Sequence, residues 1–284
     1  MQDRCLALFV CFELLFVVIN KQLSIFNYII MEKKYYFLGT PSGANEEIKK
    51  ILTDLSIPFK QIEADKYGSY LLKAEDVKEF VEAGYSIVCI DAKNVSGYAA
   101  KVMKRSEVSC LDLIMVEYNL PSNAWLDLVR DNDEQYFPKY PYSTKGMEML
   151  VRSGYSRKDI NAVRAYDRKA KGVTKVEEKQ TDEALKNAVN VDGLLIVEEL
   201  PHSKFQSVID KAFWLQRYQN IVIFSTDGNF LYYGFANVAF EVMKAGYAQI
   251  TCWCYNEGTY NEAKKQALIK LLKKQSKLRK RQLM

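Results

Sequence analysis

The sequence predicts an α/β protein with an N-terminal parallel sheet and flanking helices, a helical connector, and a smaller mixed α/β second domain. Three observations lead to this class. Short apolar runs alternate with segments whose apolar residues recur every three or four positions, the pattern of strands alternating with helices. Three helical segments in succession interrupt the alternation in mid-chain. Further on, Asp227-Gly228 stands between two apolar runs and predicts a hairpin.

Residues 31–135 are expected to form the first α/β domain. Tyr85–Ile90 is continuously apolar, as in a parallel strand buried on both faces, and Leu111–Val116 predicts a further buried strand. Apolar residues at helical spacing predict a helix over residues 95–103. The full expected set is strands at 35–38, 57–62, 85–90 and 111–116, and helices at 48–55, 77–81 and 95–103.

Residues 136–191 are expected to be a linker followed by the helical connector. The prolines of the run YFPKYPY exclude a helix and a central strand there. Two interpretations of this run remain, a rigid linker or aromatic rings that stack on nucleobases with Lys139 beside a phosphate. Helices are predicted at about 144–153, 157–171 and 181–190, with Gly154 and Gly172 ending the first two.

Residues 192–260 are expected to form the smaller α/β domain, and residues 261–284 a basic amphipathic tail helix. The pattern predicts strands at 194–197, 221–224, 230–233 and 248–254, and helices at 205–213 and 238–243, the latter closed by Gly246.

Residues 1–30 are interpreted as an apolar extension or a non-native start. The run CLALFVCFELLFVVI is shorter than the ~20 apolar residues that a spanning helix needs, and Glu13 lies in its middle. No stable membrane insertion is therefore expected, and the fold is predicted to begin near Met31.

Composition excludes several classes of function. The 284 residues suggest about two domains at ~150 residues each, and 49% hydrophobic with 26% charged residues is typical of globular proteins. His202 is the single histidine, which excludes histidine-rich zinc sites and mechanisms built on two imidazoles. The six cysteines form no metal-site or disulfide pattern, which favours core thiols in a reducing, cytoplasmic compartment over a redox or metal role.

Positive charge is concentrated in the tail. Residues 262–284 hold nine lysines and arginines and one acidic residue, Glu262, so their net charge is +8. Since the whole chain has a net charge of +5, residues 1–261 have a net charge of −3. A tail helix of this kind binds a membrane surface, nucleic acid or an acidic protein, or else docks by its leucines with its lysines solvated. The candidate binding residues are Lys264, Lys265, Lys273, Lys274, Arg279 and Arg281.

A phosphate site is predicted at the turn after the first strand. Ser42 and Asn45 stand where this turn opens a helix, and the free N–H groups of a helix N-terminus suit a phosphate. The same residue types also serve as ordinary helix caps, and this alternative stays open.

Carboxylates at the carboxyl edge of the first sheet are candidate metal ligands. Asp91 ends the strand YSIVCID with Lys93 close behind it as a ligand-binding candidate, and Asp131 and Asp133 follow the fourth predicted strand. Such carboxylates suit Mg²⁺ or Mn²⁺. Alternatively these aspartates cap the turns that follow.

His202, Ser203 and Lys204 form a second group of ligand-binding candidates. They follow the first strand of the second domain and precede a helix, where they would face a phosphate or carboxylate across a cleft between the two lobes. Capping of the helix by Ser203 is the alternative.

The predicted order of elements resembles the DHH phosphoesterase family in its topology, over most of residues 31–260. Asp91 stands where the Asp-His-His signature of that family ends its third strand, although Ala92-Lys93 replaces the histidines. The loop after the first strand is replaced by residues 40–45, and the glycine-rich motif of the second domain is absent. The resemblance implies a two-lobed phosphoesterase fold without the histidines of the family's two-metal site.

Two hypotheses for function follow. In the first, the protein binds, and in a catalytic version hydrolyses, a nucleotide-like or other phosphorylated compound in an interlobe cleft, as a degenerate or non-catalytic DHH-like phosphoesterase. A catalytic version would use an all-carboxylate divalent metal site. In the second, it is a non-enzymatic interaction protein whose basic tail binds nucleic acid or an acidic partner.

Overall fold

The computed structural model describes residues 33–39, 41–62, 71–90, 94–95, 101–103, 108–136, 150–215, 220–247, 249–252 and 255–282. The described residues form two compact units, one from those up to residue 40 together with those between 52 and 104, and the other from residues 41–51 together with those from 105 onward. No helix within the described ranges is long and apolar enough to cross a membrane. Residues 1–30 lie outside the described part, as does the aromatic run from residue 137 onward.

The described strands of the first unit form a parallel sheet in the order β2-β1-β4-β6, which confirms the predicted parallel sheet. Helix α3 (Ala74–Glu82) covers one face through Val77, which packs with Phe37 and Cys89. In β1 and β4, consecutive residues point to opposite faces of the sheet, and consecutive residues such as Phe37 and Leu38 are both buried. The two strands are therefore buried on both faces of the sheet. The strands are β1 (Lys34–Leu38), β2 (Phe59–Gln61), β4 (Ser86–Ile90) and β6 (Lys101–Met103), with a separate short pair β3 (Leu71–Leu72) and β5 (Asn94–Val95).

The predicted helix over residues 95–103 is wrong. Asn94–Val95 and Lys101–Met103 are strands, and Val102 pairs with Cys89 of β4. Valine and methionine at three- and four-residue spacing fit a helix by pattern alone, but pairing with neighbouring strands overrides so short a signal.

The predicted strand Leu111–Val116 is also wrong, because these residues form helix α4 (Cys110–Glu117). Ser109 is its N-cap and accepts the N–H of Leu111 at 3.2 Å. A short apolar run does not distinguish a buried strand from a buried helix. Asp131 and Asp133 therefore follow no strand and lie within helix α5 (Ala124–Tyr136).

The described strands of the second unit form a mixed sheet in the order β11-β12-β10-β9-β8-β7. Strands β8 and β9 are parallel, and the predicted hairpin at Asp227-Gly228 joins β9 to β10 antiparallel, with Gly228 at φ +82°. The strand predicted at 248–254 corresponds to Gln249–Cys252, and the antiparallel strand that follows it, Tyr255–Thr259, was not predicted. The strands are β7 (Val189–Val191), β8 (Leu194–Leu200), β9 (Ile221–Ser225), β10 (Asn229–Tyr233), β11 (Gln249–Cys252) and β12 (Tyr255–Thr259).

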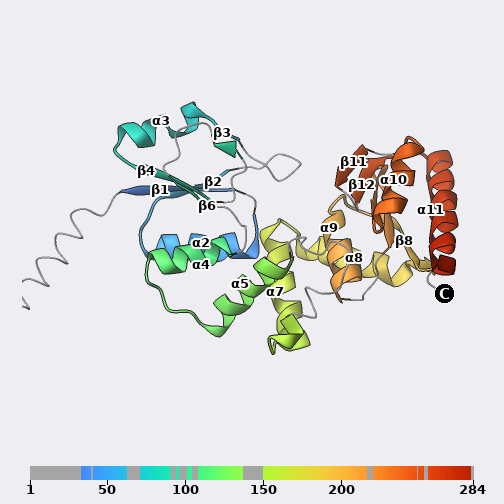
Figure 1. Cartoon of the computed structure of the whole chain (residues 1–284), viewed down its shortest axis with the longest axis horizontal. Helices are drawn as coiled ribbons and strands as arrows, with labels where there is room; N and C mark the ends of the chain where they lie inside the picture. Colours follow the sequence, from blue (N-terminus) through green and yellow to red (C-terminus); the bar gives the residue numbers. More distant parts are fainter. Residues whose placement is uncertain are drawn as a thin grey trace, which may run out of the picture. The chain divides into compact units, whose positions relative to one another are not determined.

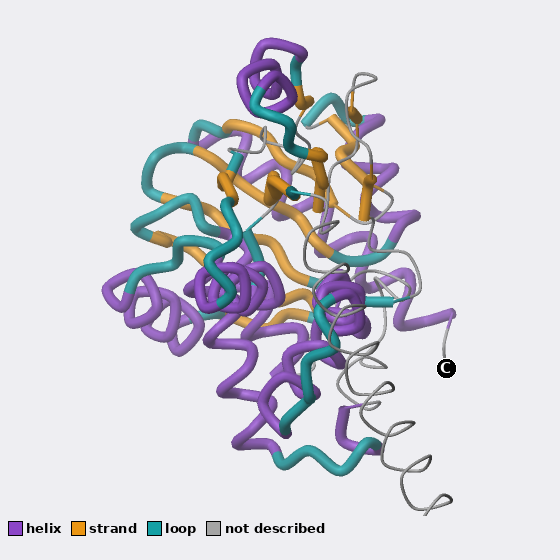
Figure 2. Tube along the Cα trace, turned by 90° about the vertical axis from the view of Figure 1, so that its left-hand side faces the viewer, coloured by secondary structure: helices purple, strands orange, loops and turns teal. Residues whose placement is uncertain are grey.

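Helices cover both faces of this second sheet (Figure 1), and Figure 2 shows strands and helices together along the Cα trace. Leu195, Ile221 and Ile223 pack toward α8 and α9, whereas the alternate residues Leu194 and Val222 pack toward α10 and α11. The helices predicted at 157–171, 205–213 and 238–243 are confirmed, whereas most of the helix predicted at 144–153 lies outside the described residues. The helix predicted at 181–190 begins earlier, because Thr174 and Glu177 form a capping box, and ends at Asn187, because β7 begins at Val189. The helices are α7 (Arg157–Ala170), α8 (Lys175–Asn187), α9 (Phe205–Ile209) continued by the π-helix η1 (Asp210–Leu215), α10 (Ala236–Lys244) and α11 (Glu262–Gln282).

Candidate functional site

The parallel strands β8 and β9 end at one edge of the second sheet. Leu200 pairs with Ser225, so the segments that follow both strands leave the sheet side by side. Ligand residues of α/β sheets gather at such carboxyl ends. We call His202, Ser203, Lys204, Ser225 and Asp227 the edge cluster.

Asp227 is the centre of hydrogen bonding in the edge cluster. Its carboxylate accepts the hydroxyls of Ser203 and Ser225, and the N–H of Asn229 at 3.3 Å. The hydrogen bond from Ser203, followed by that from Ser225, lowers the pKa of Asp227 to about 2. Asp227 is exposed, so the edge cluster presents a negative charge to solvent at neutral pH.

His202 holds the loop after β8 against α8. Its Nδ1 accepts the N–H of Lys204 at 3.1 Å, so in the neutral ring Nε2 carries the proton. Nε2 lies 3.2 Å from both Thr181 Oγ1 and the carbonyl oxygen of Glu177. Because the Ser203 hydroxyl donates to Asp227 instead, the histidine and the serine have different partners and do not form a nucleophile–base pair.

Lys204 is the cation of the edge cluster. Its side chain is 39% exposed, and Nζ donates to the carbonyl oxygen of Gly172 and lies 4.0 Å from Glu177 Oε2. Because an ammonium group has three N–H donors, the hydrogen bond to Gly172 and the ion pair with Glu177 still leave a donor for an anion.

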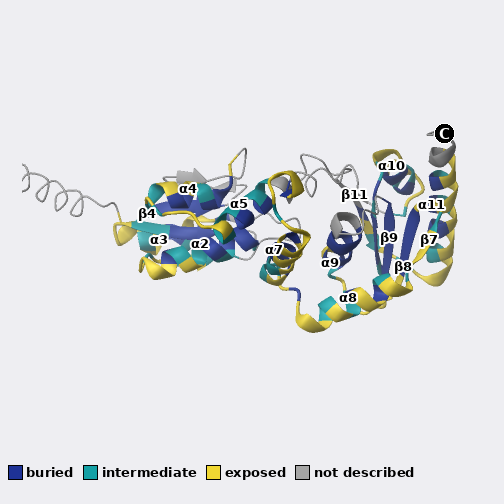
Figure 3. Cartoon of the chain, turned by 90° about the horizontal axis from the view of Figure 1, so that it is seen from below, coloured by how far each residue is buried: buried dark blue, intermediate teal, exposed yellow. Residues whose placement is uncertain are grey.

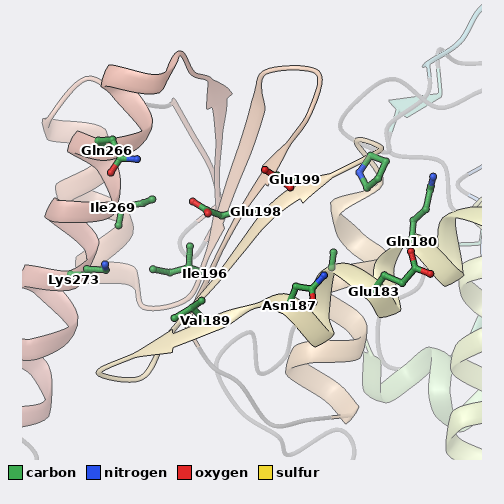
Figure 4. Close-up of a pocket in the computed structure, with 12 residues that line it drawn as sticks. Gln180, Glu183, Asn187, Val189, Ile196, Glu198, Glu199, Gln266, Ile269 and Lys273 are labelled. Carbon is green, nitrogen blue, oxygen red and sulfur yellow. The ribbon is translucent and has the colours of Figure 1, made fainter.

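A cavity of about 530 Å³ opens beside this edge (Figure 4). It exists because β7 pairs with only the first three residues of β8, which leaves the second half of β8 exposed between α8 and α11. Three carboxylates and one lysine line it, so it disfavours a bare phosphate and suits hydrogen-bonding or cationic groups. The charged lining residues are Glu183, Glu198, Glu199 and Lys273.

The carboxylates on β8 were not predicted from the sequence. Glu199 has φ +55° at an irregularity of the β8–β9 register, and Glu198 forms an ion pair with Lys265 at 3.1 Å. The available signal was the acidic pair Glu198-Glu199, which interrupts an otherwise apolar strand.

The predicted phosphate site at the start of α2 (Gly43–Asp54) holds a carboxylate of the protein itself. Ser42 is buried and its Oγ accepts the N–H of Asn45 at 3.2 Å, which is the capping role. The N–H of Gly43 donates to Asp167 Oδ1 at 2.9 Å. Burial raises the pKa of Asp167, but Lys171, Arg164 and this N–H outweigh burial and lower it to about 2. A phosphate here would meet a permanent negative charge.

Asp131 and Asp133 have separate structural partners. Asp131 accepts the hydroxyl of Tyr155 at 2.8 Å and Arg130 Nε at 3.1 Å, whereas Asp133 accepts the hydroxyl of Ser109 at 3.0 Å. Within the described ranges no group of three His, Cys, Asp or Glu side chains is arranged to hold a metal ion. Asp91 and Lys93 lie outside those ranges.

The tail helix α11 is docked on the second sheet through Leu268, Ile269 and Leu272. Lys264 and Lys265 lie over aromatic rings of the sheet, 5.7 Å and 5.4 Å from their centroids. Among the other predicted tail residues, Lys273 and Lys274 are exposed, and Arg279 and Arg281 lie on α11 with side chains outside the described part.

Comparisons with known proteins find structural likeness without a sequence match. No family model matches the sequence, and no curated protein matches it. The pGpG-specific phosphodiesterase PggH from Vibrio cholerae superposes with a TM-score of 0.50 at 8% identity, over 87% of this chain and 99% of that chain. An uncharacterized protein from Helicobacter pylori G27 covers 84% of this chain and 99% of its own at 9% identity, but with a TM-score of 0.26. The first likeness supports the two-unit α/β fold.

Proposed function

We propose that this protein binds a small, nucleotide-like phosphorylated compound, as a degenerate or non-catalytic DHH-like phosphoesterase. One observation carries the proposal: the fold shared with a pGpG-specific phosphodiesterase extends over 87% of this chain and 99% of that one. A shared fold alone does not specify a function, so the proposal also needs residues suited to a phosphate.

Lys204 is the residue we assign to the phosphate. Its ammonium group is partly exposed and supplies charge-assisted hydrogen bonds, which phosphates accept strongly. The Ser203 hydroxyl donates its hydrogen bond to Asp227 and therefore positions the loop. The start of α2 is less suitable, since a phosphate at Ser42 and Asn45 would be repelled by Asp167.

Binding without turnover is the version we favour. The described carboxylates do not fit a Mg²⁺ or Mn²⁺ site, because Asp131 and Asp133 are engaged by Tyr155, Arg130 and Ser109. We therefore derive no hydrolytic step. Asp91 and Lys93 remain candidates from the sequence for ligand or metal binding.

Calorimetric titration of the full chain with pGpG, GMP and guanosine, with and without Mg²⁺, tests the proposal. Phosphorylated compounds should bind and guanosine should not. Lys204→Gln should weaken binding roughly 10-fold to 100-fold, the range for a lost hydrogen bond between charged groups. Lys175→Gln, an exposed lysine on α8, is the matched control and should bind as the wild type does.

Two results would overturn parts of the proposal. Absence of binding by every phosphorylated compound would refute the function. Equal affinities of the Lys204→Gln and Lys175→Gln variants would refute the assignment of Lys204 while leaving the function in place.

A further inference from the structure

We propose that the outward face of α11 is a docking surface for the sugar–phosphate backbone of a nucleic acid. The surface consists of four exposed lysines, which we call the lysine stripe: Lys270, Lys273, Lys274 and Lys277. This inference is independent of the nucleotide site proposed above, because it uses a different element and different residues.

The spacing of the lysine stripe places its members on one side of the helix. Positions i, i+3, i+4 and i+7 form a continuous row on an α-helix. Leu268 and Leu272 are fully buried and Ser276 is nearly so, which fixes the opposite side against the sheet. Figure 3 shows exposed residues along α11 on the side away from the sheet. The stripe is therefore held on a docked helix and faces solvent.

Lys273 also lines the cavity that Glu183, Glu198 and Glu199 make acidic, but no ion pair neutralises the stripe within the described part of the chain. None of its four lysines forms an ion pair there, in contrast to Lys265, which pairs with Glu198. The sole acidic residue among positions 262–284 is Glu262, two turns before the stripe. Like charges at i, i+4 destabilise a helix, and a polyanion bound along the row would remove this repulsion.

The geometry favours a nucleic acid over a lipid surface. An interfacial helix inserts an apolar face into the membrane, but the apolar face of α11 is already buried against the sheet through Leu268, Ile269 and Leu272. Residues 262–284 also contain no aromatic residue to anchor in lipid. At 1.5 Å rise per residue the stripe extends for about 10 Å, comparable to roughly three successive phosphates at 3.4 Å per strand.

Fluorescence anisotropy with labelled 20-nucleotide single-stranded and duplex DNA, over a series of salt concentrations, tests this inference on the full chain. The wild type should bind at low salt. The fourfold Lys→Gln variant of the stripe should bind at least tenfold more weakly. If all four lysines contact phosphates, the slope of log K against log salt should be shallower in the variant than in the wild type. The expected difference is about 3 for single-stranded DNA and slightly more for duplex DNA.

The matched control removes the same charge elsewhere. A fourfold Lys→Gln variant at Lys158, Lys169, Lys175 and Lys186, all exposed on α7 and α8, should keep wild-type affinity. Both variants change exposed side chains, and their unfolding curves verify that they remain folded. Equal losses in the two variants would refute a localised surface, and no binding by the wild type at 50 mM salt would refute the proposal outright. Binding to phosphatidylserine vesicles without binding to DNA would identify a membrane surface and likewise overturn it.

Discussion

Asp167 on α7 accepts the backbone N–H of Gly43 at the first position of α2, at 2.9 Å. The same carboxylate receives Lys171 Nζ at 2.6 Å and lies 3.6 Å from Arg164. Gly43 allows this approach because a Cβ atom there would lie 3.2 Å from the ring of Tyr166. A buried side chain thus supplies the negative charge that a helix N-terminus attracts.

We predict that Asp167→Asn lowers the free energy of unfolding by about 3 kcal/mol, because it removes a buried anion that Arg164 and Lys171 share, although Arg164 keeps its pair with Asp210. Urea denaturation at pH 7 measures this change. Asp54→Asn, at the exposed last position of α2, is the control and should lie within about 0.5 kcal/mol of the wild type. A loss below about 1 kcal/mol for Asp167→Asn would contradict the proposed role of the carboxylate.

The stability difference between the wild type and Asp167→Asn should depend on pH. Asp167 has a pKa of about 2 in the folded protein, against about 3.9 in an unfolded chain. Since folding lowers this pKa, the contribution of the ionised group is complete above pH ~4 and is lost as the pH falls toward 2. Denaturation curves of both proteins between pH 6 and pH 2 should therefore converge at the acidic end. A difference that stays constant over this range would show that the carboxylate does not act through its charge.

Removal of the Asp210 charge is predicted to be more damaging than removal of an exposed partner in the same network. Asp210 is fully buried and accepts hydrogen bonds from Arg164 and Arg168. Asp210→Asn removes the buried carboxylate that both guanidinium groups share, although Arg164 keeps Asp167 and Arg168 keeps Glu178, and should cost about 3–5 kcal/mol. Asp182→Asn, whose exposed side chain pairs with Lys211, should cost less than about 1 kcal/mol. Thermal unfolding of the two variants makes the comparison, and similar losses would contradict it.

Most elements of the fold were predictable from local pattern. The hairpin at Asp227-Gly228, the buried strand Ser86–Ile90 and the tail helix depend on turn chemistry, apolar runs and helical spacing within a few residues. The errors fell where a short apolar run fits two structures, as at Leu111–Val116, which is a helix because Ser109 caps it.

The candidate site could be predicted only in part. Residue type and position after a strand identified His202, Ser203 and Lys204, but which atoms they contact depends on Thr181 and Asp227, more than twenty residues away along the chain. The same holds for Ser42, whose helix N-terminus is neutralised by Asp167, 124 residues beyond Gly43. Short-range sequence patterns indicate the backbone conformation that a segment prefers. The interaction partner of a charged side chain depends instead on contacts between segments that are distant in the sequence. The sequence by itself therefore determined the types of most elements and the candidate residues. Which atoms those residues contact was decided by the tertiary packing.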